Sequence, residues 1–553
     1  MAANDNRRNR NEDQEIDRDK IEELLFSRNT KKFGFDLNPV VSLGAGIIII
    51  IFSAFALINL ERANILVNSV NEIIVTNFDW IFILSSSFFI LICIYIAFSK
   101  LGKVKIGGLN AEREFSNFAW YSMLISAGMG IGLMFWAVGE PLTHFEVLPP
   151  VFDSPFDKHT AMATTFFHWG LHPWAVYSLI ALALAFFAYN KHLPLSIRSV
   201  FYPFFKERVY GTLGDVIDTL AVLSTLFGLA TSLGLGAQQI NSGLDYLFDI
   251  GFSVNIQVAL IIGITLLATI SVLSGIDKGV KFLSKMNIRL AAILMGIILL
   301  LGPTGFILRL FSNSLGLYFN NIIEYSFFIA VEETGWQANW SIFYLAWWIS
   351  WSPFVGMFIA RISKGRTIRE LILGVMIVPS LLSFLWLSVF GGSAIFINEQ
   401  VGGLYEVVQD DLPVALYELV NLLNLPLLAE LFRILLFILI TFLVAVYFIT
   451  SSDSGSLVVN KITSSGKLNT PANQRAFWAI LEGLLAAVLL LIGGEKALLA
   501  LQTAVISTGL PFAVVLTAMA FALIKGIEDT RREQKRKRER RKFEKLLKAH
   551  DQE

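Results

Sequence analysis

The chain has 553 residues, of which 55% are hydrophobic and only 16% are charged. Its apolar residues occur in blocks of about 20 or more, the length that crosses the hydrocarbon core of a bilayer. Composition therefore excludes a soluble globular protein and predicts an all-α polytopic membrane protein. The single cysteine, Cys93, excludes an intramolecular disulfide and a cysteine-based metal cluster, and no nucleic-acid partner is expected.

Twelve candidate spans follow one another along the chain. They begin near Val40, Trp80, Trp120, Ala161, Val216, Val254, Ile288, Asn339, Ile368, Leu431, Gln474 and Ala497. Lys and Arg collect after every second span, from Lys100, Lys103 and Lys105 onward, whereas the loop 394–430 carries only acidic charges. By the positive-inside rule the basic loops and both termini are cytoplasmic.

Two glycine- or proline-rich interruptions, SAGMGIGLM (126–134) and WWISWSPFVG (347–356), each open a series of five spans. An odd number of spans per repeat makes the second copy inverted, as in many secondary transporters. This predicts six parts: a cytoplasmic tail (1–38), two additional N-terminal helices (39–118), a first five-helix repeat (119–311), an extracellular connector (312–338), a second, inverted repeat (339–525) and a basic cytoplasmic helix (526–553).

Aromatic residues cluster in two of the spans. In span eight five of them fall within an arc of roughly 100° at about 100° per residue: Trp340, Tyr344, Trp347, Trp348 and Trp351. Span four adds Trp169, Trp174 and Tyr177 around Pro173. Non-helical backbone at membrane depth is tolerated only where it is buried or lines a cavity. By contrast Trp80, Trp120 and Trp336 suit the headgroup level.

These two groups predict an aromatic cage for a cation. No intramembrane Asp or Glu is expected beside them, and an indole face attracts a quaternary ammonium by about 0.5 to 2 kcal/mol. An amino-acid carrier would more naturally provide a fixed charge for its ammonium group. The alternative is that the rings only pack against one another.

Five segments together resemble the betaine/choline/carnitine transporter family, in its glycine-betaine branch. They are AGMGIGLMFWAVGEP (127–141), FHWGLHPWAVY (167–177), TLFGLATSLGLGAQQI (225–240), AWWISWSPFVGMFIARISKGRTIRE (346–370) and TSSDSGS (450–456). The resemblance implies a leucine-transporter-like fold of 12 helices, sodium-coupled uptake by alternating access, a homotrimer, and osmotic regulation through the termini. It also implies a cell-membrane protein that is not an enzyme and uses sodium as coupling ion without another cofactor.

Transferred to this sequence, the resemblance assigns the sites. The betaine cage corresponds to Trp169, Trp174, Tyr177 and Trp348, the cytoplasmic exit to Trp347 and Trp351, and the unwound helix to Gly128, Met129, Gly130 and Gly132. One sodium site corresponds to the carbonyls of Ser126, Met129 and Tyr447 and the hydroxyls of Thr450 and Ser451. A second would include Thr225, but Leu229 stands where another hydroxyl is expected, so the sodium stoichiometry stays open.

The same resemblance narrows the substrate. Choline-type members place an acid where Gly132 stands, so Gly132 favours a zwitterion, and Thr450 with Ser451 favours sodium symport over exchange. Glycine betaine is the leading substrate, and ectoine, proline betaine or a choline- or carnitine-type substrate are the alternatives.

Other polar residues are expected to be structural. Asp453 is expected to make a hydrogen bond at a helix end, and Glu482 to pair with Arg475 or to reach the cytoplasmic interface, although an intramembrane carboxylate is a functional candidate by default. His168 and His172 are expected to pack or to form hydrogen bonds rather than bind a metal.

The segment from residue 525 onward holds 12 of the 44 Lys and Arg residues and favours one long helix. Such a cluster binds anionic lipid, with the mixed segment 11–25 as a possible electrostatic partner and simple anchoring as the alternative. A channel would need a continuous polar lining, and a membrane enzyme would need a group of converging acids or histidines. Neither pattern is evident in the sequence. The sequence has no P-loop.

Overall fold

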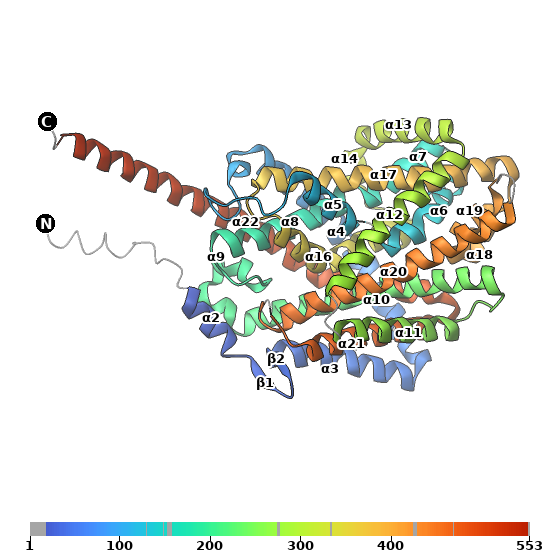
Figure 1. The fold of residues 1–553 in the computed structure, drawn as a ribbon, viewed down its shortest axis with the longest axis horizontal. Helices are drawn as coiled ribbons and strands as arrows, with labels where there is room; N and C mark the ends of the chain where they lie inside the picture. The colour runs from blue at the N-terminus through green and yellow to red at the C-terminus, as the bar shows by residue number, and fades with distance from the viewer. Residues whose placement is uncertain are drawn as a thin grey trace.

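The structure, a computed structural model, consists almost entirely of α-helices packed side by side (Figure 1). It describes residues 18–128, 130–147, 149–151, 157–273, 277–331, 335–423, 429–467 and 469–550. Within these residues nine helical segments are long and apolar enough to cross a membrane, and a pair of helices bent by 108° would make a tenth. The protein is therefore a polytopic membrane protein, whereas the count of twelve spans and their inverted repeat stay predictions.

Helices lie at the predicted span positions. The uninterrupted ones are α3 (Pro39–Ile58), α4 (Leu60–Phe98), α10 (Thr212–Phe248), α11 (Val254–Leu273), α12 (Asp277–Leu301), α17 (Ile368–Val401), α20 (Ala429–Thr463), α21 (Ala472–Gly493) and α22 (Ala497–His550). The expected start of the second span near Trp80 is wrong, because α4 begins at Leu60, where the Asn59 side chain accepts a hydrogen bond from the backbone N–H of Arg62. Asn59 thus satisfies one of the free donors at a helix start.

Two spans are broken where the sequence has glycine. α5 (Asn117–Gly128) and α6 (Ile131–Glu146) are separate helices, with Gly130 in an extended conformation between them. α7 (Lys158–Trp169) and α8 (Leu171–Asn190) are separated at Gly170. A Cβ on Gly170 would come within 2.5 Å of the Phe166 carbonyl oxygen and 2.6 Å of the Phe384 ring, so this close approach requires glycine.

The interruption expected in span eight is wrong. α16 (Phe343–Ile362) runs without a break through Pro353. Pro353 has no N–H to give to the carbonyl of Ile349, and the hydroxyl of Ser352 donates to that carbonyl instead, at 2.7 Å. The irregular part of this span is a π-helical turn at its start, Ala338–Ile342, so the proline is accommodated because a neighbouring hydroxyl supplies the lost hydrogen bond.

Additional helices occupy predicted loops. The connector 312–338 includes most of α13 (Thr304–Asn320), which is bent by 108° from α12, and all of α14 (Ile322–Phe327) and α15 (Gly335–Gln337). α18 (Leu404–Asp410) and α19 (Ala415–Leu422) lie at the end of the molecule far from the C-terminus (Figure 1). Trp120, expected at headgroup level, is fully buried, and its Nε1 donates to Ser363 Oγ at 3.1 Å.

The helix α2 (Arg18–Phe26) and the basic end of α22 lie at the same end of the molecule (Figure 1). A two-stranded hairpin, β1 (Thr30–Lys32) with β2 (Phe35–Leu37), follows α2. Next to it Asp215 of α10 binds Arg28 at 2.5 Å and the fully buried Arg198 at 3.0 Å. The basic side chain that follows α2 is thus paired with α10. Residues 11–17 of the segment 11–25, the expected partner of the C-terminal helix, lie outside the described residues.

Candidate functional site: an aromatic pocket at a helix break

The four predicted cage residues form one cluster. The break at Gly170 puts Trp169 at the end of α7 and Trp174 and Tyr177 in the first two turns of α8, while Trp348 faces them from α16. Ring centroids are 4.9 Å apart for Trp169 and Trp348, 5.3 Å for Trp174 and Tyr177, and 6.4 Å for Tyr177 and Trp348. Each of the four side chains is at most 5% exposed. Three separate helix segments therefore present aromatic rings to one another in the interior.

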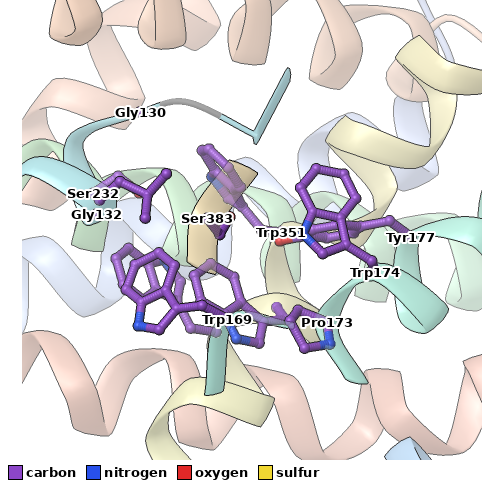
Figure 2. Close-up of a pocket in the computed structure, with 12 residues that line it drawn as sticks. Gly130, Gly132, Trp169, Pro173, Trp174, Tyr177, Ser232, Trp351 and Ser383 are labelled. Carbon is purple, nitrogen blue, oxygen red and sulfur yellow. The ribbon is translucent and has the colours of Figure 1, made fainter. Parts of the chain in front are cut away.

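These rings surround a pocket of about 450 Å³ of space between atoms (Figure 2). The rest of its lining is Gly130, Gly132, Leu133, Pro173, Trp347 and Trp351, together with the hydroxyl-bearing residues Ser232 of α10 and Ser383 of α17. The predicted exit residues Trp347 and Trp351 thus border the same pocket. Mostly aromatic walls with a few polar groups are typical of a small-molecule site.

Gly132 lies in close contact with two pocket indoles. A Cβ at this position would lie 2.9 Å from Trp347 Cη2 and 3.1 Å from Trp169 Cη2. At Gly130 the nearest such atom, Trp351 Cη2, is 3.9 Å away. An acidic side chain therefore cannot occupy position 132 unless two tryptophans move.

Two indoles are held by hydrogen bonds to the backbone. Trp348 Nε1 donates to the carbonyl of His168 at 2.8 Å, and Trp347 Nε1 donates to the carbonyl of Gly228 at 3.3 Å. The hydroxyl of Tyr177 and Nε1 of Trp351 are buried and have no hydrogen-bond partner among the described residues. The pocket wall therefore combines fixed aromatic rings with two buried donors that remain available to a ligand.

The expectation of no acid beside the cage is wrong. Glu140 of α6 is completely buried, and its Oε2 accepts hydrogen bonds from Trp169 Nε1 at 2.7 Å and from the Tyr344 hydroxyl at 2.6 Å. Its Oε1 lies 2.7 Å from His168 Nδ1. Both carboxyl oxygens are thus occupied by protein groups, and Glu140 connects α6 to the cage tryptophan of α7 and to α16.

The residues predicted to hold the first sodium ion are only partly described. Met129 lies outside the described residues, and so does the side chain of Ser126. Tyr447, Thr450 and Ser451 lie close together on the continuous helix α20, where Thr450 Oγ1 is 2.9 Å from the Val446 carbonyl and 3.2 Å from that of Tyr447. The assignment of these residues to a sodium site stays a prediction.

At the second predicted sodium site the structure places a hydroxyl and an apolar side chain. Thr225 Oγ1 donates to the carbonyl of Ala221, 2.7 Å away within α10. Leu229, one turn further, packs against α20, where a Cβ on Gly455 would be only 2.3 Å from Leu229 Cδ1. An apolar side chain thus fills the contact between α10 and α20 at the place where another hydroxyl ligand would be needed.

The structure shows which of the polar residues expected to be structural have partners. Arg475 forms an ion pair with Asp453, which joins α21 to α20. The expected pairing of Glu482 with Arg475, or its extension to the interface, is therefore wrong: Glu482 is completely buried, and neither of its oxygens has a hydrogen-bond partner among the described residues. His172 forms a hydrogen bond as expected, from Nε2 to Ser326 Oγ at 3.0 Å.

Sequence reasoning missed Glu140 and the two pocket serines. A usable signal for Glu140 is its spacing, because Glu140 and His144 are four residues apart and so lie on one face of a helix. For Ser232 and Ser383 no comparable signal exists, since isolated serines are common in membrane helices and only the packing of α10 and α17 brings them to the pocket.

The fold and the pocket together define a class of protein, a polytopic helical membrane protein with a buried aromatic site at a broken helix. Residues 40–532 match the model of the family described as "BCCT, betaine/carnitine/choline family transporter". The chain belongs to this family.

Several curated relatives cover most of the chain. Glycine betaine transporter 1 of Vibrio parahaemolyticus is 45% identical over 91% of this chain and 96% of its own length. A glycine betaine/proline/choline/ectoine transporter of the same organism is 45% identical over 90% of this chain and 89% of that protein. A glycine betaine transporter of Bacillus subtilis is 41% identical over 85% and 90%, respectively. The family match over residues 40–532 includes all the helices that build the pocket.

Proposed function

We propose that this protein takes up glycine betaine together with sodium, by alternating access across the cell membrane. The observation that carries the proposal is the aromatic pocket, where Trp169, Trp174, Tyr177 and Trp348 meet around a helix break. A trimethylammonium group has no hydrogen to donate and therefore gains most from aromatic faces, at about 0.5 to 2 kcal/mol each. The names of the relatives support the same substrate.

The charges around the pocket favour a zwitterion. Glu140 is not among the residues that line the pocket, and its oxygens face Trp169, Tyr344 and His168, so this carboxylate does not contact a cation in the pocket directly. The unpartnered donors of Tyr177 and Trp351 suit the carboxylate of the substrate. Gly132 leaves no room for an acidic side chain on the α6 side of the pocket. The negative charge that balances the ammonium group is therefore carried by the substrate itself.

Sodium coupling rests on α20. We assign the coupling ion to the hydroxyls of Thr450 and Ser451 and to the carbonyls near the break between α5 and α6, because hydroxyls and free carbonyls at a broken helix are suitable sodium ligands. Leu229 argues against a complete second site. We further propose a homotrimer whose basic C-terminal helix binds anionic lipid and responds to osmotic stress.

The second candidate function is uptake of several compatible solutes, such as proline, choline and ectoine, in addition to glycine betaine. It is favoured by the relative named as a glycine betaine/proline/choline/ectoine transporter, which is as similar to this chain as the glycine betaine transporter of the same organism. Ser232 and Ser383 give the pocket wall polar groups that a ring-shaped solute could use.

The test is uptake of radiolabelled glycine betaine into proteoliposomes, with either sodium or potassium outside, and with ectoine, proline and choline as competitors. We expect sodium-dependent accumulation that Trp348→Ala abolishes and Trp80→Ala, at a 47% exposed tryptophan, leaves intact. Absence of accumulation and of displacement would reject the substrate. Accumulation without sodium dependence would keep the cage and reject the assignment to Thr450 and Ser451.

A further inference from the structure

Next to the aromatic pocket lies a compact group of side chains of the types that bind metals, a capacity that the transport proposal does not use. Glu140 and His144 project from the same face of α6, and His168 joins them from α7. Glu140 Oε1 is 2.7 Å from His168 Nδ1 and 3.5 Å from His144 Nε2, and ligand atoms of the three residues all lie within 4.8 Å of one another. All three side chains are at most 2% exposed.

His144 is the feature that calls for an explanation. It is 2% exposed, its Nδ1 has no hydrogen-bond partner among the described residues, and its Nε2 has only the 3.5 Å contact with Glu140 Oε1. Its ring instead lies among aromatic rings, with centroids 4.6 Å from Trp340 and 5.3 Å from Trp336. A buried polar group without a partner is unfavourable by about 1 to 3 kcal/mol, and a bound ion would satisfy it.

The groups behind the candidate ligands are already arranged as they are in metal sites. Glu140 Oε2, the oxygen that faces away from the histidines, accepts hydrogen bonds from Trp169 and Tyr344, which fixes the carboxylate plane. His168 Nε2 is 3.0 Å from Ser341 Oγ, which leaves Nδ1 for a metal. Metal-bound histidines and carboxylates almost always have such outer partners.

We propose that Glu140, His144 and His168 bind a transition-metal ion of the zinc type. Two imidazoles and one carboxylate form a common ligand set for zinc, and bonds of about 2.0 to 2.1 Å place tetrahedral ligand atoms about 3.4 Å apart. The two separations that involve Glu140 Oε1, 2.7 and 3.5 Å, bracket that value, and the two histidine nitrogens lie within 4.8 Å of each other, so the site is completed by movement of the side chains toward a common centre. The ion replaces the proton shared by Glu140 and His168, and its fourth position is left for water.

Such an ion ties α6 to α7 directly, and to α16 through Tyr344 and Ser341. Trp169, which lines the aromatic pocket, donates a hydrogen bond to the carboxylate of Glu140. The bound metal therefore restricts relative movement of these helices, and we expect micromolar Zn²⁺ to slow uptake. Metal binding itself does not depend on the identity of the transported solute, so its test stands apart from the betaine experiment.

The test uses the purified full-length protein with any affinity tag removed, incubated with Zn²⁺ or Co²⁺ in the presence and absence of sodium, so that the buried site can open. We expect one ion per chain, a visible Co²⁺ absorption band, and nitrogen and oxygen neighbours at about 2.0 to 2.1 Å by X-ray absorption. His144→Ala and His144→Gln should abolish stoichiometric binding, and Ser341→Ala should weaken it about tenfold. His172→Ala, at a buried histidine outside the group, is the matched control.

Size-exclusion profiles show whether each variant is folded. A wild-type protein that binds no stoichiometric metal under either condition overturns the proposal without reference to any variant. Binding that persists in folded His144 variants, or that is lost equally in His172→Ala, also overturns it. The group is then a hydrogen-bonded network that only orients Trp169.

Discussion

Gly132 is a residue at which a single methyl group should change substrate binding. Its added Cβ would lie 2.9 Å from Trp347 and 3.1 Å from Trp169, so both rings must move by a few tenths of an ångström. We expect Gly132→Ala to raise the KM for glycine betaine about tenfold, equivalent to about 1.4 kcal/mol, and Gly132→Asp to abolish uptake. Gly130→Ala, with its nearest ring atom at 3.9 Å, should have a smaller effect. An unchanged KM in Gly132→Ala would contradict this packing.

Glu140 should position the cage rather than bind the substrate. In Glu140→Ala both carboxyl oxygens are lost, so Trp169 and Tyr344 lose their shared acceptor and His168 loses its partner. A buried donor left without its acceptor costs about 1 to 3 kcal/mol, so we expect a KM increase of about tenfold or more with a folded protein. Uptake kinetics and the size-exclusion profile measure both parts. A normal KM would show that the indole is held by ring packing alone.

The sequence predicts the cage residues but not the group that holds them. The aromatic groups of spans four and eight could be found because tryptophan is uncommon at mid-depth in a membrane and because helical spacing places several on one face. The choice of Trp169, Trp174, Tyr177 and Trp348 among them is what the resemblance to the transporter family implies. Glu140 is not distinguishable in this way, since its importance depends on α6 and α7 being neighbours. The packing of α6 against α7 belongs to the tertiary structure, and neither hydropathy nor residue spacing predicts it.

At the scale of whole helices, glycines mark the points where two membrane helices break, whereas a proline in α16 does not break its helix. The break at Gly130 occurs inside the glycine-rich interruption that the sequence predicts, whereas the break in span four lies at Gly170, three residues before the proline noted there, because a close contact at Gly170 excludes a side chain. Pro353 does not break α16, because Ser352 supplies the hydrogen bond that Ile349 would otherwise lack. Whether a proline interrupts a membrane helix thus depends on a neighbouring hydroxyl as well as on the proline.

The sodium site proposed on α20 leads to a testable prediction for Thr450. If Thr450 is a sodium ligand, Thr450→Ala should raise the sodium concentration for half-maximal uptake about tenfold, while uptake at saturating sodium persists. Thr517→Ala is the matched control, because Thr517 also donates to a carbonyl of its own helix, Ala513, but lies on α22. Sodium titrations of betaine uptake measure the difference. Equal sodium dependence in both variants would remove Thr450 from the site.

The loop between α18 and α19 should make stability depend on pH. Burial, together with the nearby charge of Asp245, raises the pKa of Asp411 to about 6, whereas an unfolded aspartate has a pKa of about 4. The folded state therefore binds this proton more tightly, and stability falls as the pH rises from about 4 to about 6. Asp411→Asn should raise the thermal unfolding temperature at pH 7.5 and lose that advantage near pH 4. The exposed neighbour Asp410 provides the control, Asp410→Asn, and the same gain in both variants would contradict the assignment.

Across the whole molecule, the order of the helices could be predicted and their neighbours could not. Hydropathy marks the spans because each must hide about 20 residues of backbone in lipid. The packing of α8 against α16, which builds the pocket, and of α10 against α20 joins segments far apart in the sequence. The common location of α2 and the end of α22 is consistent with the charge pattern of the loops, which assigns both termini to one side (Figure 1).

That shared end is where osmotic regulation should be detectable. Lys191, in the loop after α8, binds Glu533 of α22 at 3.1 Å and so connects the end of α8, a helix that lines the aromatic pocket, to the base of the C-terminal helix. An ion pair this exposed contributes about 0 to 1 kcal/mol, so Glu533→Lys should shift the osmolality of half-maximal uptake without abolishing transport. The double exchange Lys191→Glu with Glu533→Lys restores the pair with its charges reversed and should return the midpoint toward that of the wild type. Proteoliposomes of fixed anionic lipid content, assayed over a series of osmolalities, measure all the variants. If the double exchange does not reverse the shift of the single one, the helix is controlled by its lipid contacts and not by this ion pair.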